Sequence, residues 1–80
     1  MSIEERVSRV LVDGLGLEAR KISADASLKE NLGVDSMELE EMLAALEKEF
    51  GVKVPEGVIH CNCTVRELVN YFGRTLKRTS

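Results

Sequence analysis

Apolar residues recur at three- and four-residue steps in three stretches of this 80-residue chain, the spacing that places side chains on one face of an α-helix. The first stretch predicts a helix from Ile3 to Asp13. Ser2 and Glu5 have the spacing of a capping box at its start, and Gly14 with Gly16 predicts its end. The apolar face of this helix comprises Ile3, Val7, Val10 and Leu11.

The region from Leu15 to Leu32 shows no sustained period and predicts a long loop. Its apolar residues are expected to anchor it to the core, and they are Leu17, Ile22, Leu28 and Leu32. The second helix is the most strongly predicted of all. Asp35 and Glu38 form a capping pair at its start, and Gly51 follows its last residue. Its apolar stripe comprises Leu39, Met42, Leu43, Leu46 and Phe50.

A third helix is predicted to open at Thr64, which has capping-box spacing to Glu67. Its apolar face comprises Val65, Leu68, Val69, Phe72 and Leu76. Before it, the segment PEGVIH predicts a turn or a short helix, which Pro55 favours and Gly57 opposes. Three main helices, one short helix and no period-two strand predict an all-α fold. We expect a small antiparallel four-helix bundle with a long first loop, in one domain spanning residues 1–80.

Composition and charge narrow the class of function. The chain is 44% hydrophobic, enough for one compact core, and its net charge of −3 argues against a nucleic-acid surface, which needs a concentrated excess of Lys and Arg. No stretch is long and apolar enough to span a bilayer, and the start, MSIEERVSRV, lacks the apolar run of a signal peptide. We therefore expect a cytoplasmic protein, a monomer, with no nucleic-acid partner.

The acids are concentrated on the second helix. Residues 35–50 contain six acids and one base, so this segment carries −5 and the rest of the chain +2. Projection at 100° per residue places Ser36 in the first turn, where it should reach solvent. The face opposite the apolar stripe presents Met37, Glu40, Glu41, Ala44, Glu47 and Lys48. Such a face suits docking to basic partners, and a merely solvated helix face is the alternative.

The start of this helix also carries a recognisable motif. Gly33, Asp35, Ser36 and Met37 resemble the Gly-x-Asp-Ser-Leu motif of the acyl carrier protein family, with Met where Leu is usual. The downstream ALEKEFGVKVPE, residues 45–56, also resembles the family, and a looser likeness extends from the first helix to Leu76. This motif, placed at the start of an acidic helix, makes the resemblance to the family specific.

The resemblance implies a carrier and not an enzyme. Ser36 would bear 4′-phosphopantetheine, transferred from coenzyme A by a separate phosphopantetheinyl transferase, and Asp35 would help to present that serine. The arm would hold acyl groups as thioesters for acyl-transfer, condensing and related enzymes of fatty-acid, lipid or polyketide biosynthesis. A phosphodiester on Ser36 also fits physically, because it would lie at the positive end of a helix dipole.

The resemblance further implies a set of partner-binding residues that face basic docking patches. They are Met37, Glu38, Glu40, Glu41, Ala44 and Glu47. The candidates for an acyl pocket are Leu39, Leu43, Leu46 and Phe50. The family usually places apolar residues at the positions of Glu40 and Ala44, so the sequence leaves open whether this is a specialised member that serves a dedicated pathway.

Other functions are less well supported by the residues. His60, Cys61 and Cys63 lack a fourth ligand at zinc spacing, so we expect no metal site. No G-x-S-x-G elbow surrounds Ser36, which argues against a hydrolase. The alternative from a different class is an unmodified helical adapter whose acidic face binds a basic protein partner. Modification of Ser36 distinguishes that adapter from a carrier.

Overall fold

The computed structural model describes residues 2–79, with side chains described as far as residue 76. Its three α-helices are α1 (Ile3–Leu15), α2 (Ser36–Phe50) and α3 (Val65–Thr79), and a single 3₁₀ turn, η1, covers Ala19–Lys21. Within residues 2–79 the only strand-like feature is an isolated bridge between Ser27 and Thr64. The expected all-α class is therefore confirmed.

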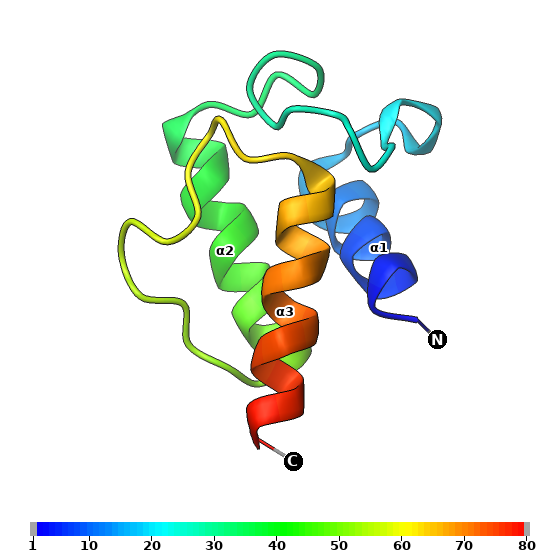
Figure 1. The fold of residues 1–80 in the computed structure, drawn as a ribbon. Helices are drawn as coiled ribbons and strands as arrows, with labels where there is room; N and C mark the ends of the chain where they lie inside the picture. The colour runs from blue at the N-terminus through cyan, green and yellow to red at the C-terminus, as the bar shows by residue number, and fades with distance from the viewer. Residues whose placement is uncertain (1, 80) are drawn as a thin grey trace.

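The helices do not all alternate in direction. Figure 1 shows α1 running toward the end of the molecule at which the long first loop lies, while α2 and α3 both run away from that end. Residues 51–64 make this possible, because they carry the chain back along the molecule from the end of α2 to the start of α3. The expected antiparallel bundle is therefore not confirmed, because α2 and α3 run in the same direction and only α1 runs toward the opposite end.

The short fourth helix is not confirmed. Residues 55–58 form a turn, in which the Val58 N–H donates to the Pro55 carbonyl oxygen at 3.4 Å, and no helix follows it in the described residues before α3. Gly57 has a φ of 83°, in the left-handed region, which interrupts any right-handed helix that Pro55 could begin. The fold of the described residues is therefore a three-helix bundle with two long connections.

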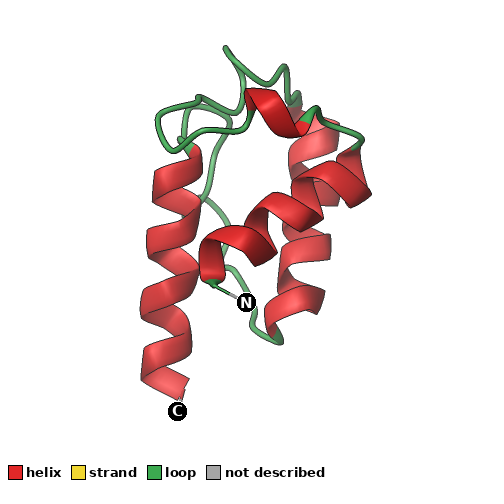
Figure 2. Ribbon diagram, turned by 90° about the vertical axis from the view of Figure 1, so that its right-hand side faces the viewer, coloured by secondary structure: helices red, strands yellow, loops and turns green. Residues whose placement is uncertain are grey.

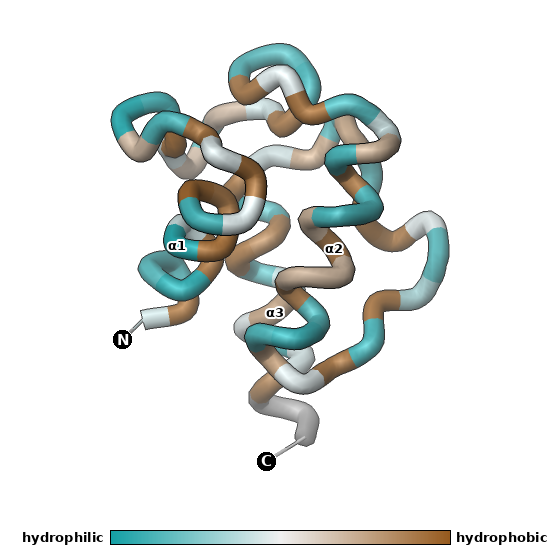
Figure 3. Tube along the Cα trace, turned by 180° about the vertical axis from the view of Figure 1, so that it is seen from behind, coloured by the Kyte–Doolittle hydropathy of each residue, from teal (hydrophilic) through white to brown (hydrophobic). Residues whose placement is uncertain are grey.

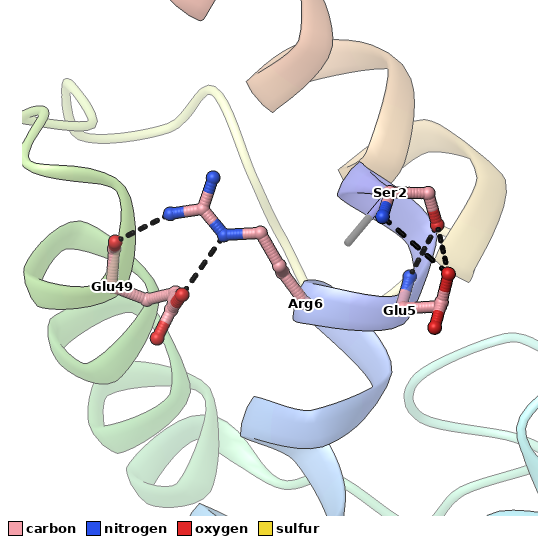
Figure 4. Close-up of polar contacts among 4 residues, drawn as sticks. All are labelled: Ser2, Glu5, Arg6 and Glu49. Carbon is pink, nitrogen blue, oxygen red and sulfur yellow. Dashed lines mark hydrogen bonds and ion pairs between the residues drawn. The ribbon is translucent and has the colours of Figure 1, made fainter.

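The helix ends follow from local capping chemistry. The sequence predicts that α1 ends at Asp13, but the helix continues through Gly14 to Leu15. Gly16, with a φ of 70°, is the residue that ends it, and its N–H donates to the Val12 carbonyl at 3.0 Å. Both halves of the Ser2–Glu5 capping box are formed at the other end of α1 (Figure 4).

The core lies where the three apolar faces meet. Figure 2 shows α1 crossing obliquely between α3 and α2, and α1 packs against both. Brown and teal segments alternate along the helices in Figure 3, as expected of amphipathic helices. The fully buried side chains comprise Val7, Leu11, Leu28, Val34, Met42, Leu46, Leu68 and Phe72.

A polar tie fastens α1 to the last turn of α2. The Arg6 Nε donates to the Glu49 Oε2 at 2.9 Å, and its Nη2 donates to the Glu49 carbonyl oxygen, also at 2.9 Å (Figure 4).

Among residues 2–79, no helix combines the length and the hydrophobicity that a bilayer crossing requires.

Candidate functional site

Asp35 fixes the start of α2 immediately before the candidate serine. Its backbone is extended, with φ −91° and ψ −175°, and its Oδ1 accepts a hydrogen bond from the Glu38 N–H at 2.8 Å. The Asp35 carbonyl oxygen accepts the first intrahelical bond, from the Leu39 N–H at 2.8 Å. Ser36 is consequently the first helical residue, and its side chain is exposed.

The first two backbone N–H groups of α2, those of Ser36 and Met37, lie at the exposed start of the helix. Within the part of the chain that the structure describes, no hydrogen bond joins the N–H of Ser36 or of Met37 to another group. The start of α3 differs, because the Val65 N–H donates to the Ala26 carbonyl at 3.0 Å and the Arg66 N–H to the Ala24 carbonyl at 2.9 Å. Free donors and a positive helix end therefore coincide at Ser36, an arrangement that suits a phosphate group.

The long first loop holds this helix start in place. The Leu28 N–H donates to the Cys63 carbonyl at 3.0 Å, and the Lys29 N–H donates to the Cys61 carbonyl at 3.0 Å. The loop then closes on itself, because the Val34 N–H donates to the Leu28 carbonyl at 2.8 Å. Val34 is buried directly before Asp35, so the segment that leads to Ser36 is anchored in the core. The Cys61 and Cys63 carbonyls thus help to position the site, a contribution that no residue pattern in the sequence signals.

Most of the predicted partner-binding residues lie on the solvent side of α2. Met37 is 72% exposed, the most exposed large hydrophobic side chain among the described residues. Glu40, Glu41 and Ala44 are also exposed, and Glu38 is half-buried.

Glu47 has a different environment from these residues. Its side chain is half-buried, and its Oε2 accepts a hydrogen bond from the Val54 N–H at 2.7 Å. This carboxylate is thus turned toward the connection that follows α2, where it binds the chain's own backbone.

The chain is similar to known proteins over nearly its whole length. The family model described as "Phosphopantetheine attachment site" matches residues 5–72, which include all of α2. An acyl carrier protein of Nitratidesulfovibrio vulgaris (strain DP4) is 37% identical over 71 residues, which make up 89% of this chain and 93% of that relative. The acyl carrier protein of the Miyazaki F strain is 35% identical over the same shares. The chain belongs to the acyl carrier protein family.

Membership of the acyl carrier protein family settles the class of chemistry. Proteins of this family carry covalently attached 4′-phosphopantetheine and are carriers, not catalysts, and both statements apply to this chain. The expected cofactor and the expectation of a non-enzymatic carrier are therefore confirmed. The exposed serine at the start of α2 and the free donors beside it fit such a group.

The four acyl-pocket candidates of this acyl carrier family member lie on the inner side of α2. Leu46 and Phe50 are buried in the core, while Leu39 and Leu43 are half-buried at its border. A cavity of about 290 Å³ lies instead between α1, the first loop and the beginning of α3, and none of the four candidates lines it.

The candidate metal ligands lie just before the start of α3. His60 is exposed, Cys61 is half-buried and Cys63 is buried, and both cysteines are free thiols. Among the described residues, no group of three or more His, Cys, Asp or Glu side chains is placed to hold a metal ion.

Proposed function

We propose that Ser36 is the residue to which 4′-phosphopantetheine is attached, and that the chain delivers acyl thioesters to enzymes of fatty-acid, lipid or polyketide biosynthesis. One observation carries the assignment to Ser36. This serine is exposed at the first position of α2, beside two backbone N–H groups that have no acceptor among the described residues. Asp35 supports the assignment by fixing where the helix begins.

The attachment needs little chemistry from the carrier itself. A phosphopantetheinyl transferase would direct the Ser36 Oγ to the phosphorus of coenzyme A that bears pantetheine. A phosphoester bond forms, the pyrophosphate bond breaks, the serine proton passes to the transferase, and adenosine 3′,5′-bisphosphate leaves. The chain contributes an exposed hydroxyl at the start of α2, where the free N–H groups and the helix dipole stabilise the new phosphodiester.

The bound arm ends in a thiol, which supplies the thioester linkage for acyl cargo. The partner enzymes would meet the chain on the solvent side of α2, around the exposed Met37 and the acids that follow it. Complementary charge steers such encounters and selects the partner more than it adds affinity. If part of an acyl chain enters the bundle, the half-buried side chains of Leu39 and Leu43 must move to admit it.

Intact-mass measurement tests the attachment site directly. The apo chain is incubated with coenzyme A and a broad-specificity phosphopantetheinyl transferase, and a gain of one phosphopantetheine group is expected. Ser36→Ala should abolish the gain. Ser23→Ala is the matched control, because Ser23 is another exposed serine that lies in the first loop, and this variant should gain the group in full.

The same experiment distinguishes the carrier from the adapter. A folded wild-type chain that gains no mass with several transferases contradicts the proposal and favours an unmodified helical adapter. A gain that persists in Ser36→Ala contradicts the assignment of the site alone.

A further inference from the structure

The charged residues of α2 and the segment after it fall into two halves. Residues 35–41 hold four acids and no base: Asp35, Glu38, Glu40 and Glu41. Residues 42–53 hold two acids and two bases: Glu47, Lys48, Glu49 and Lys53. Both lysines are exposed. The negative charge that the sequence assigns to the whole helix therefore belongs to its first two turns.

Both acids of the second half are held by the protein itself. The Glu47 Oε2 accepts a hydrogen bond from the Val54 N–H at 2.7 Å. The Glu49 Oε2 accepts one from the Arg6 Nε at 2.9 Å, as Figure 4 shows. A partner that used either carboxylate would first have to compete with these bonds. Glu47, which the helical projection places on the docking face, thus binds the connection after α2, and Glu49 binds α1.

One line along the exposed side of α2 shows the same change of charge. Met37, Glu41, Ala44 and Lys48 follow one another at steps of four, three and four residues, which places them on one face of the helix. Along this line an exposed apolar side chain and an acid come first, and a base follows about 10 Å after that acid, at 1.5 Å per residue. A partner surface that is basic along the whole helix would bring like charges together at Lys48.

We propose that partner enzymes dock on the first two turns of α2 only, and that Lys48 selects against enzymes whose basic patch extends farther along the helix. The proposal rests on the carrier function argued above. It describes the partner by its chemistry: basic side chains facing Glu40 and Glu41, an apolar recess for Met37, and neutral or acidic groups opposite Lys48.

Two double variants with the same change in net charge test where docking occurs. Glu40→Gln with Glu41→Gln removes two charges from the first half, and Glu47→Gln with Glu49→Gln removes two from the second. The probe is a broad-specificity phosphopantetheinyl transferase with coenzyme A, and kcat/KM for modification of the apo chain is measured by intact mass at low and at high salt.

We expect kcat/KM to fall about tenfold for the Glu40/Glu41 pair, and this loss to shrink at high salt because ions screen exposed charges. The Glu47/Glu49 pair should stay within about twofold of wild type, while its urea unfolding midpoint falls. The reverse pattern, or equal losses in kcat/KM from two folded variants, overturns the proposal.

A third variant tests the role of Lys48. Lys48→Glu extends the acidic line, so it should raise kcat/KM at least about threefold with a transferase whose basic patch extends beyond the first two turns of α2. An unchanged or lower kcat/KM contradicts a selective role for Lys48. Failure of the carrier function itself looks different, because the wild-type chain would then gain no phosphopantetheine at all.

Discussion

The guanidinium carbon of Arg6 lies 4.4 Å from the ring centroid of Phe50. The same ring stacks on Phe72, with centroids 4.8 Å apart and an interplanar angle of 20°. These three residues come from α1, α2 and α3 respectively, so a continuous stack crosses the bundle near the end of α2. Together with the two bonds from Arg6 to Glu49, it joins all three helices of the bundle.

Replacing Arg6 should weaken the bundle without emptying its core. Arg6→Met keeps an unbranched apolar stem but loses the cation–π contact, the ion pair and the bond to the Glu49 carbonyl. Because the ion pair is about one-third exposed and partly screened, we expect a total loss of about 1–2 kcal/mol in the free energy of unfolding. Urea denaturation measures it.

Arg9→Met is the matched control for this prediction. Arg9 lies on the same helix and is exposed, so its replacement should change the unfolding free energy by less than about 0.5 kcal/mol. Equal losses from the two variants would show that positive charge on α1, and not the Arg6 contacts, matters.

Two glycines near the end of α1 should respond in opposite ways to alanine. Gly14 is inside the helix, and an added Cβ would meet only ordinary contacts with Ala45 and Val10, at 3.9 and 4.0 Å. Gly14→Ala should therefore raise the unfolding free energy by about 0.5–1 kcal/mol. Gly16 has a φ of 70°, so Gly16→Ala should lower it by about 1 kcal/mol through backbone strain. Thermal unfolding of both variants checks the opposite signs.

The features that the sequence predicts well are those set by neighbouring residues. Asp35 caps the start of α2 and Gly51 caps its end, as expected. Both caps act within one helical turn, one through a carboxylate and the other through a left-handed glycine. The predicted end of α1 is two residues early. Gly14 and Gly16 are both candidate C-caps, and only the positive φ of Gly16 in the folded chain shows which of them ends the helix.

The features that could not be predicted are long-range. The common direction of α2 and α3 depends on how residues 51–64 pack, and no local pattern specifies that path. A helical projection gives the direction in which Glu47 leaves the helix, but not that its carboxylate bends toward the Val54 N–H. The bonds from Leu28 and Lys29 to the Cys63 and Cys61 carbonyls join backbones more than thirty residues apart, and backbone groups leave no signature in the sequence.

The N-cap of α2 should require an oxygen acceptor but no charge. Asp35→Ala removes the acceptor of the Glu38 N–H and should lower the unfolding free energy by about 1 kcal/mol. Asp35→Asn keeps an acceptor of the same length, and Asn caps helices about as well as Asp, so this variant should lose less than about 0.5 kcal/mol. If Asn proved as destabilising as Ala, the charge of Asp35 on the helix dipole would outweigh its hydrogen bond.

Amide hydrogen exchange should separate the starts of α2 and α3. The first amides of an α-helix have no intrahelical acceptor and normally exchange fast. Val65 and Arg66, the first residues of α3, donate instead to the Ala26 and Ala24 carbonyls, so their amides should be protected. Ser36 and Met37 have no such acceptor within the described residues, so their amides should exchange near the rate of an unfolded chain.

Attachment of phosphopantetheine should change amide exchange at the start of α2 but not at the start of α3. If a phosphodiester on Ser36 accepts hydrogen bonds from the start of α2, the Ser36 and Met37 amides should slow on phosphopantetheine attachment, while Val65 and Arg66 stay as they were. Exchange followed residue by residue in apo and modified protein measures both pairs. Unchanged rates at Ser36 and Met37 would mean that the phosphate faces solvent, so that the helix start serves only to expose the serine hydroxyl.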